Sequence, residues 1–490
     1  MLTSISIPSL SACDAGGRIV KQGLDNGDGG GFAQSGVLES GEVDYTTTFC
    51  NNYSIKLTKD INPDGPDIQA NQKEAIGDTL YFAADGFDGI ELWKTDGTSE
   101  GTVLVKDIND NIDWENGDST PSWLTSVGNT LYFQADDGTN GIELWKSDGT
   151  ANGTVMVKNI NSGDAHSFCY SFTAVGNTLY FSASDGSTGH ELWKSDGTAT
   201  GTVMVKDIRS GSSGSYPSSL TAVGNTLYFQ ANDGTNGYEL WKSDGTATGT
   251  VMVKDIYPGT LSSYPDYLTA VGNTLYFQAA GGDGIELWKS DGTEVGTVMV
   301  KDIYPGVGSS DPRYITAVGN TVYFKAGSSL NGYELWKSDG TASGTKMVKD
   351  INTGSSDSSP AFLTVLGNTL YFKADDGIHG SELWKSDGTE VGTVMVKDIN
   401  SGSSASTIYT GGSSLVKFDN MLYFSATDGI HGMELWKSDG TASGTVMVED
   451  YFPGGSGEAF VLMPPTQNIL YFKLDNHLHM LGIEQEITFS

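Results

Sequence analysis

A string of eight residues returns eight times along this chain and constrains its fold more than any other feature. The string is Glu-Leu-Trp-Lys-(Ser/Thr)-Asp-Gly-Thr, and its tryptophans follow one another at intervals of 47 to 52 residues. These tryptophans are Trp93, Trp145, Trp193, Trp241, Trp288, Trp336, Trp384 and Trp436. A repeat of this length indicates a solenoid or a propeller, in which each unit buries its surface against the next one.

Each unit contains four short runs with the two-residue alternation typical of β-strands. In the fourth unit the runs, rich in Val, Thr, Tyr, Phe and Trp, are residues 220–223, 226–231, 239–242 and 250–256. Gly224-Asn225 predicts a hairpin between the first two runs, and Asp244-Gly245-Thr246 predicts a turn between the last two. Four antiparallel strands in about 48 residues predict one blade, so we expect an all-β fold, a β-propeller of four-stranded blades.

The two ends of the chain predict how the propeller closes. Residues 55–61 read as a fourth strand that no first three strands precede, whereas residues 458–490 read as a unit without a fourth strand. Pairing of the N-terminal strand with the C-terminal unit would close the ring without an exposed sheet edge. Eight complete units and one split unit predict nine blades; an eight-bladed ring with a terminal appendage and an open stacked array are the alternatives. The expected domains are a glycine-rich, non-repeat arm at residues 1–52 and a propeller at residues 53–490.

The repeat resembles the bacterial family that is named for its Glu-Leu-Trp-x-x-Asp-Gly-Thr signature. The resemblance rests on ELWKSDGT, preceded by YFxAxDGxxG and followed by GTVMVKDI, and it covers residues 53 to about 484. It implies a secreted or cell-surface protein of β-propeller-like repeats, and it implies no defined activity.

The charge of the chain limits its partners. Lys and Arg number 27 against 61 Asp and Glu, which gives a formal net charge of −34. Nucleic acid and anionic membranes are bound through Lys and Arg, so we expect neither as a partner. No apolar run approaches the roughly 18–20 residues of a membrane helix, so we expect no membrane span.

Three cysteines are too few for a disulfide scaffold. Cys13 and Cys50 flank the glycine-rich N-terminal segment, and they either pair in an exported protein or stay reduced. Cys169 is expected to be a free, buried thiol.

The repeated residues have structural interpretations that compete with functional ones. Each repeated Trp is expected to stack between adjacent blades, and a platform for sugar rings is the alternative. In the Ser-Asp-Gly-Thr turn, Asp244 and its equivalents are expected to accept N–H groups of their own turn, with a cation site as the alternative.

Acidic, glycine-rich loops between the second and third strands are candidates for calcium. Carboxylates and loop carbonyls are the oxygen ligands that calcium prefers. The candidate ligands are Asp85, Asp88, Asp136, Asp137, Asp375 and Asp376. The sixth unit has lost these acids and kept the rest of its repeat, so an ordinary turn is the favoured interpretation. We therefore expect no cofactor, with calcium as the alternative.

One face of the disc carries the variable loops. The loops between strands two and three and the connections between blades emerge on this face, while the nearly constant hairpins lie on the other. Aromatic residues on variable loops are typical of recognition surfaces, although solvated linkers would look similar. The candidate ligand-binding residues are Tyr216, Tyr257, Tyr264, Tyr267, Tyr304 and Tyr314.

These features favour an extracellular, non-enzymatic binding or structural protein, either lectin-like or a protein-binding scaffold. Its partner would be a glycan or an extracellular protein. No zinc pair HExxH, nucleophile elbow, P-loop or dinucleotide fingerprint is present, so no catalytic residue is assigned. The alternatives are a polysaccharide hydrolase or lyase acting through the asymmetric loops, and a homo-oligomer or filament whose subunits exchange the strand at residues 53–61.

Overall fold

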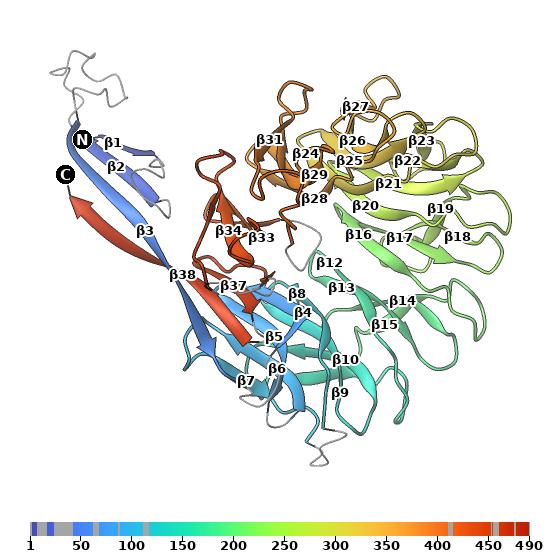
Figure 1. Cartoon of the computed structure of the whole chain (residues 1–490). Helices are drawn as coiled ribbons and strands as arrows, with labels where there is room; N and C mark the ends of the chain where they lie inside the picture. Colours follow the sequence, from blue (N-terminus) through green and yellow to red (C-terminus); the bar gives the residue numbers. More distant parts are fainter. Residues whose placement is uncertain are drawn as a thin grey trace.

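Nine antiparallel sheets stand around a common axis in the computed structural model of the chain (Figure 1). The structure describes residues 2–6, 17–23, 43–61, 68–86, 89–110, 117–409, 415–451, 453, 460–474 and 477–489. The fold is a nine-bladed β-propeller of four-stranded blades, as predicted. The described part of the chain contains no helix that is long and apolar enough to cross a membrane.

Blades 1 to 8 each consist of four consecutive strands. Their first strands, nearest the axis, are β4 (Ile68–Ile76), β8 (Ser122–Val127), β12 (Tyr170–Val175), β16 (Ser218–Val223), β20 (Asp266–Val271), β24 (Arg313–Val318), β28 (Ala361–Leu366) and β32 (Val416–Phe418). Their second strands are β5 (Thr79–Gly86), β9 (Thr130–Asp136), β13 (Thr178–Ser184), β17 (Thr226–Asn232), β21 (Thr274–Gly281), β25 (Thr321–Ser328), β29 (Thr369–Asp375) and β33 (Met421–Thr427).

The outer half of each blade contains the repeated octapeptide. The third strands are β6 (Gly89–Thr95), β10 (Ile142–Ser147), β14 (His190–Ser195), β18 (Tyr238–Ser243), β22 (Gly284–Ser290), β26 (Gly332–Ser338), β30 (Ser381–Ser386) and β34 (Met433–Ser438). The fourth strands are β7 (Val103–Lys106), β11 (Val155–Lys158), β15 (Val203–Lys206), β19 (Val251–Lys254), β23 (Val298–Lys301), β27 (Lys346–Lys349), β31 (Val394–Lys397) and β35 (Val446–Met447).

Blade 9 is shared between the two ends of the chain. Its strands, in spatial order, are β36 (Val461–Leu462), β37 (Ile469–Leu474), β38 (His477–Phe489) and β3 (Val43–Lys59), and β2 (Gly17–Gly23) and β1 (Leu2–Ser6) extend the same sheet. The predicted pairing is present, because Ile55 lies opposite Leu481 and Leu57 opposite His479. The strand begins earlier than the predicted residue 55, so the domain boundary set at residue 52 lies inside β3.

Nine apolar clusters, one at each interface between neighbouring blades, show that the ring is closed. An open row of nine blades would have only eight interfaces. The ninth cluster joins Phe82 of blade 1 to Tyr471 and Leu478 of blade 9. The nine-blade prediction is therefore confirmed over its alternatives.

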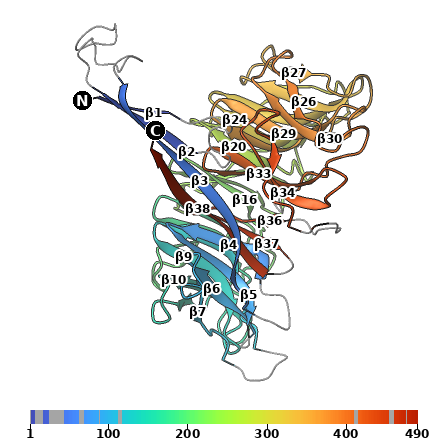
Figure 2. The same ribbon diagram turned by 60° about the vertical axis from the view of Figure 1, so that its left-hand side comes forward.

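The strands β1 and β2, together with the distal halves of β3 and β38, form a ribbon that runs away from the ring (Figures 1 and 2).

Cys13 lies outside the described residues, and the Cys50 side chain is likewise not described. Whether these two cysteines pair or stay reduced therefore remains a prediction. Cys169 is a buried free thiol, as predicted.

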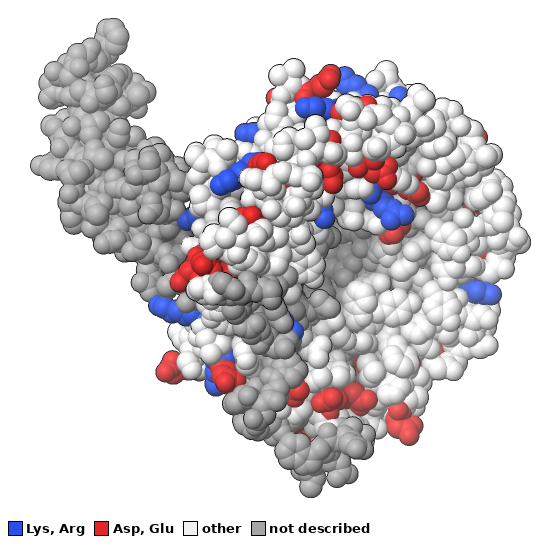
Figure 3. Space-filling view, in the orientation of Figure 1, with Lys and Arg blue, Asp and Glu red and all other residues white. Residues whose placement is uncertain are grey.

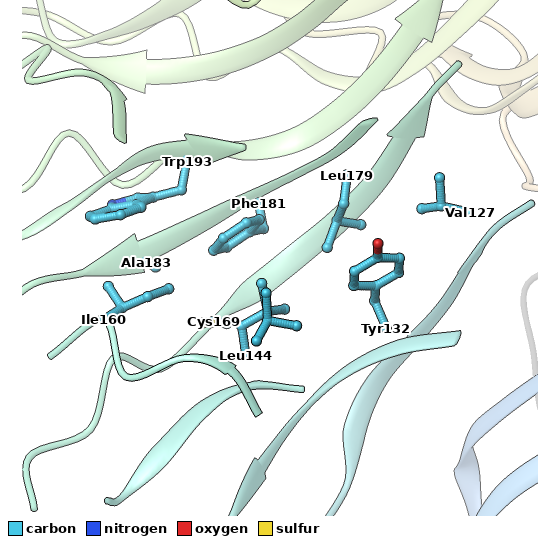
Figure 4. Close-up of a cluster of buried hydrophobic side chains, with 10 residues drawn as sticks. Val127, Tyr132, Leu144, Ile160, Cys169, Leu179, Phe181, Ala183 and Trp193 are labelled. Carbon is cyan, nitrogen blue, oxygen red and sulfur yellow. The ribbon is translucent and has the colours of Figure 1, made fainter. Parts of the chain in front are cut away.

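The repeated Trp packs between blades, as predicted. Trp193 of blade 3 is 5% exposed and belongs to the cluster that Leu144 and Tyr132 of blade 2 complete (Figure 4). The Lys158 ammonium of blade 2 lies 5.6 Å from the centre of the Trp193 ring and donates a 2.8 Å hydrogen bond to the Thr202 carbonyl oxygen. The seven interfaces from blades 1 and 2 to blades 7 and 8 therefore combine apolar burial with a cation on an aromatic face.

The repeated Glu has a role that the sequence interpretation missed. Glu239 is fully buried; its Oε2 accepts hydrogen bonds from the Ile256 N–H at 2.8 Å and the Ser263 hydroxyl at 2.7 Å, and its Oε1 accepts one from the Ser263 N–H. Burial raises the pKa of Glu239 to about 7 against the effect of these donors. The carboxyl holds the connection to the next blade in place, and the equivalent Glu residues of other blades do the same.

Candidate recognition face

The connections between blades fold back over the beginning of the third strand. The N–H of Tyr216 donates to the carbonyl oxygen of His190, and the N–H of Tyr264 donates to that of Tyr238. The same contact recurs at Ser119, Ser167, Ser310, Ser358 and Ser406. The variable connections and the loops between strands two and three therefore lie together on one face, which we call the connection face.

A repeated left-handed backbone shapes the inner rim of the connection face. Each first strand from blade 2 to blade 7 has a bulge whose residue has φ between 53° and 58°, at Trp123, Ser171, Ser219, Tyr267, Tyr314 and Phe362. Tyr216 and Tyr264, at the ends of connections, also have positive φ. Because non-glycine residues rarely adopt this region and bulges re-aim side chains, the frame holds these positions in orientations that an ordinary strand would not provide.

Aromatic residues occupy many of these positions and contact one another across blades. The His190 and Tyr216 rings stack with centroids 5.5 Å apart, and so do the Tyr238 and Tyr264 rings. Tyr170 lies 5.2 Å from His190. Two further contacts are Trp123–Tyr170 and Tyr267–Tyr314. The rings therefore form three separate groups along blades 2 to 6, and we call them together the aromatic arc: Trp123, Tyr170, His190 and Tyr216; Tyr238 and Tyr264; and Tyr267 and Tyr314.

The aromatic arc reaches solvent, unlike the aromatic residues inside the blades. Trp123, Tyr216 and Tyr264 are 46%, 44% and 59% exposed, whereas Trp241 of the repeated octapeptide is 6% exposed. Ring–ring contacts fix the aromatic residues before any ligand arrives, so a ligand that covers them loses little side-chain entropy. The arrangement suits a ligand with flat apolar surfaces.

Four of the six predicted tyrosines belong to the aromatic arc: Tyr216, Tyr264, Tyr267 and Tyr314. The other two, Tyr257 and Tyr304, occupy equivalent half-buried positions in the turns that begin the connections, and the Tyr304 ring covers Gly308 of its own connection. Neither of these two described rings stacks on a ring of the arc.

The sequence interpretation missed Trp123, Tyr170, His190 and Tyr238. His190 and Tyr238 directly precede the repeated Glu-Leu-Trp-Lys, at a position that is Ile90, Ile142, Ile285, Tyr333, Ser381 and Met433 in the other blades. Variation at one position of an otherwise constant strand was the signal that could have found them.

A pocket of about 220 Å³ lies beside the Trp123 end of the aromatic arc, between blades 1 and 2. Its lining consists of Gln69, Gln72, Ala83, Ile90, Thr120, Pro121 and Ser122. The backbone N–H of Trp123 donates a 2.9 Å hydrogen bond to Gln72 Oε1, which links the pocket to the arc. Amides and hydroxyls beside an aromatic ring provide the donors and acceptors that a polyhydroxylated ligand needs.

The acidic loops proposed for calcium fold as turns that their own carboxylates cap. Asp137 Oδ1 accepts the N–H groups of Thr139 and Asn140 at 2.9 and 2.7 Å. Asp376 does the same for Ile378 and His379, and its Oδ2 lies 2.7 Å from His379 Nδ1.

The remaining calcium candidates follow the same pattern or lie elsewhere. Asp136 and Asp375 accept the N–H groups of Gly138 and Gly377. Asp85 is the second-last residue of β5, and Asp88 lies outside the described residues. Within the part of the chain that the structure describes, no three His, Cys, Asp or Glu side chains are placed to hold a metal ion together.

Comparisons with known proteins bear on the fold alone. No family model and no curated protein matches the sequence. Among solved structures, BamB from Moraxella catarrhalis is 14% identical with a TM-score of 0.37, over 77% of this chain and 98% of BamB. A puromycin-hydrolyzing peptidase of Mycobacterium tuberculosis is 10% identical with a TM-score of 0.39, over 72% of this chain and 58% of the peptidase. At this identity and TM-score, neither likeness indicates an activity.

Proposed function

We propose that the chain is an extracellular, non-enzymatic binding protein that recognises a glycan through the aromatic arc. The observation that carries the proposal is the two stacked ring pairs, His190–Tyr216 and Tyr238–Tyr264, whose Tyr216 and Tyr264 are exposed and have positive φ. Sugar rings present apolar C–H faces and a rim of hydroxyls, which match the rings of the arc and the amides of the neighbouring pocket.

The resemblance of the repeat to the ELWxxDGT family supports a place outside the cell, because it implies secreted or cell-surface proteins. The closed ring supports a scaffold role, since each blade packs against its neighbours and most of the variation between units lies in the connections. Strand exchange between subunits finds less support, because β3 pairs with β38 of its own chain.

A glycan array with the full-length protein tests the proposal. The variant Tyr216→Ala/Tyr264→Ala removes two exposed rings of the arc, and Val295→Ala is the matched control. Val295 is 89% exposed and lies in the turn between the third and fourth strands of blade 5, on the opposite face.

We expect the wild type and the control to bind the same glycans and the double variant to lose about tenfold or more in affinity, since burial of each ring contributes about 1 kcal/mol or more. Binding that the double variant retains in full would contradict the assignment of the site. An array without any bound glycan would contradict the proposed function itself.

A further inference from the structure

Most lysines of this protein serve the joints between blades. Fifteen of them donate hydrogen bonds to a carbonyl oxygen of the next blade, either a Gly of the Ser-Asp-Gly-Thr turn or the Thr that precedes the fourth strand. Lys325 and Lys373 depart from this rule. They occupy the fifth position of a second strand, where the other blades carry Ala83, Gln134, Ser182, Gln230, Gln278, Ser425 and, in blade 9, Lys473.

Lys325 and Lys373 lie with Arg313 in what we call the basic cluster. Arg313 and Lys325 are opposite one another on β24 and β25 of blade 6. Lys373 lies on β29 of blade 7, whose first strand β28 contacts β24. Burial lowers the pKa of Lys325, the charge of Asp357 raises it, and the charges of Arg313 and Lys373 lower it, so the three cations lie close enough to repel one another.

The basic cluster is held in place without a salt bridge. The Lys325 ammonium lies 4.7 Å from the centre of the Tyr333 ring, and the Lys373 ammonium lies 5.2 Å from that of Phe362. Among the described residues, no carboxylate lies within salt-bridge distance of any of the three cations, although the chain has 61 Asp and Glu. Lys325 and Lys373 are half-buried, whereas Arg313 is exposed. Removing part of the water around a cation without pairing it is costly, and a bound anion would reduce that cost.

The nearest carboxylates have other partners. Asp311 Oδ2 accepts the Tyr333 hydroxyl at 2.9 Å, and Asp357 Oδ1 accepts the Tyr333 N–H at 2.8 Å. Asp266 Oδ1 accepts the Ser219 hydroxyl at 3.0 Å. Asp357 and Asp311 therefore lie near the basic cluster, where their charges raise the pKa of Lys325, but neither forms a salt bridge with it.

The basic cluster lies at one end of the aromatic arc. Arg313 directly precedes Tyr314, whose ring lies 6.1 Å from that of Tyr267, and the charge of Arg313 lowers the pKa of Tyr267 against the larger effect of burial. Figure 3 shows the ring hollowed at its centre, with basic and acidic side chains both present near the hollow. A ligand lying along the arc would therefore meet the basic cluster directly after its last rings.

We infer that the glycan bound by the aromatic arc carries an isolated oxyanion group, a carboxylate or a sulfate ester, that binds to Arg313, Lys325 and Lys373. This inference rests on the proposed function and adds the chemical class of the ligand. The charge must be sparse, because the net charge of −34 repels a dense polyanion while three adjacent cations accommodate one oxyanion.

Matched oligosaccharide pairs test the inference: xylohexaose with and without a single glucuronic acid branch, a neutral hexasaccharide with and without one sulfate ester, and polygalacturonate as the dense polyanion. The variant Lys325→Gln/Lys373→Gln introduces the residue that blades 2, 4 and 5 carry at this position, so it keeps the repeat frame. Lys346→Gln is the control, because Lys346 is an exposed lysine of β27, outside the basic cluster.

We expect wild type and Lys346→Gln to bind the acidic member of a pair about tenfold or more tightly than the neutral member, and to bind polygalacturonate weakly. In the double variant the ratio of affinities for the acidic and neutral members should fall to near one, while the affinity for the neutral member is unchanged. In the wild type, 0.5 M salt should reduce this ratio. Whether the carboxylate or the sulfate pair shows the larger ratio identifies the oxyanion.

Equal binding of acidic and neutral members by the wild type would overturn the inference, and so would a preference that survives in the double variant. Both results leave the proposed function standing as long as the neutral member binds. Loss of all glycan binding on a broad array would overturn the proposed function instead.

Discussion

Lys59 donates a 2.9 Å hydrogen bond to the carbonyl oxygen of Thr102, and this bond joins the N-terminal strand β3 to blade 1. Lys106 and Thr154 form the same bond, also at 2.9 Å, between blades 1 and 2. The closing interface therefore repeats this bond of the interfaces between consecutive units, although the other strands of blade 9, β36 to β38, come from the far end of the sequence.

Truncating an apolar residue at the closing interface should cost as much stability as truncating one elsewhere in the ring. Leu478 lies in the closing cluster and Leu275 in the cluster between blades 4 and 5, and both are fully buried. We expect Leu478→Ala and Leu275→Ala each to lower the free energy of unfolding by about 2–5 kcal/mol in urea titrations. A nearly neutral Leu478→Ala beside a costly Leu275→Ala would mean that the ring is open at this interface.

The buried Glu residues predict that stability falls as the pH rises from about 5 to 7. Burial raises the pKa of Glu239 from its usual 4.5 to about 7, and it does the same at Glu91, Glu143, Glu334 and Glu382. The folded chain therefore binds more protons than the unfolded chain between these pH values, so the free energy of unfolding decreases with rising pH in this range and is level above it.

Thermal unfolding between pH 3 and pH 8 checks this dependence. We expect a higher Tm at pH 5 than at pH 8 and a shallower slope for Glu239→Gln, whose amide does not titrate. Below pH 4 the sign reverses, because hydrogen bonds to Thr246 lower the pKa of Asp244 in the folded chain, and its stabilising effect is lost on protonation. A Tm that rises from pH 5 to pH 8 would contradict the assignment.

The Gly of the Ser-Asp-Gly-Thr turn should be intolerant of any side chain for two reasons. Gly245 has φ of +88°, and a Cβ there would contact the Tyr180 hydroxyl of the preceding blade, whereas Gly224 has φ of +59° and open space. Gly224→Ala should therefore cost about 1–2 kcal/mol from backbone strain alone, and Gly245→Ala more. Adding Tyr180→Phe to Gly245→Ala should recover part of the difference; a purely additive double-mutant cycle would show that the contact is unimportant.

Calcium should have little effect on the stability of the ring. The carboxylates of Asp137 and Asp376 already accept hydrogen bonds from their own turns, so no binding energy is expected to add to the folded state. We expect the Tm in excess EDTA and in 5 mM calcium to agree within about 1 °C. An increase of several degrees that Asp376→Asn abolishes would show that calcium binds at this loop.

Local patterns in the sequence were enough to predict the blades, because each strand and turn of a unit is coded within its own 48 residues. The packing of Trp193 and the self-capping of Asp244 were predictable for the same reason. The role of Glu239 was not, since its donors at Ile256 and Ser263 lie 17 and 24 residues away and have no signature of their own.

The aromatic arc was predictable only in part. Tyr216 and Tyr264 stood out as aromatic residues on variable connections, but their partners His190 and Tyr238 sit in a constant strand. Only the folding of each connection over that strand brings the pairs together. Tyr304 was predicted to bind ligand although its ring covers its own connection. The sequence of a connection does not show which of its residues fold back on the loop.

The pairing of β3 with β38 has a mechanical consequence. The two strands are antiparallel, with Phe489 opposite Thr47 at the distal tip and Leu57 opposite His479 at the ring. Tension applied at both outer ends would therefore peel the strands apart from the tip, one pair of hydrogen bonds after another. Because the pairs would break one at a time, the ribbon would open at low force. The tension would reach the first blade only after all pairs between β3 and β38 had separated.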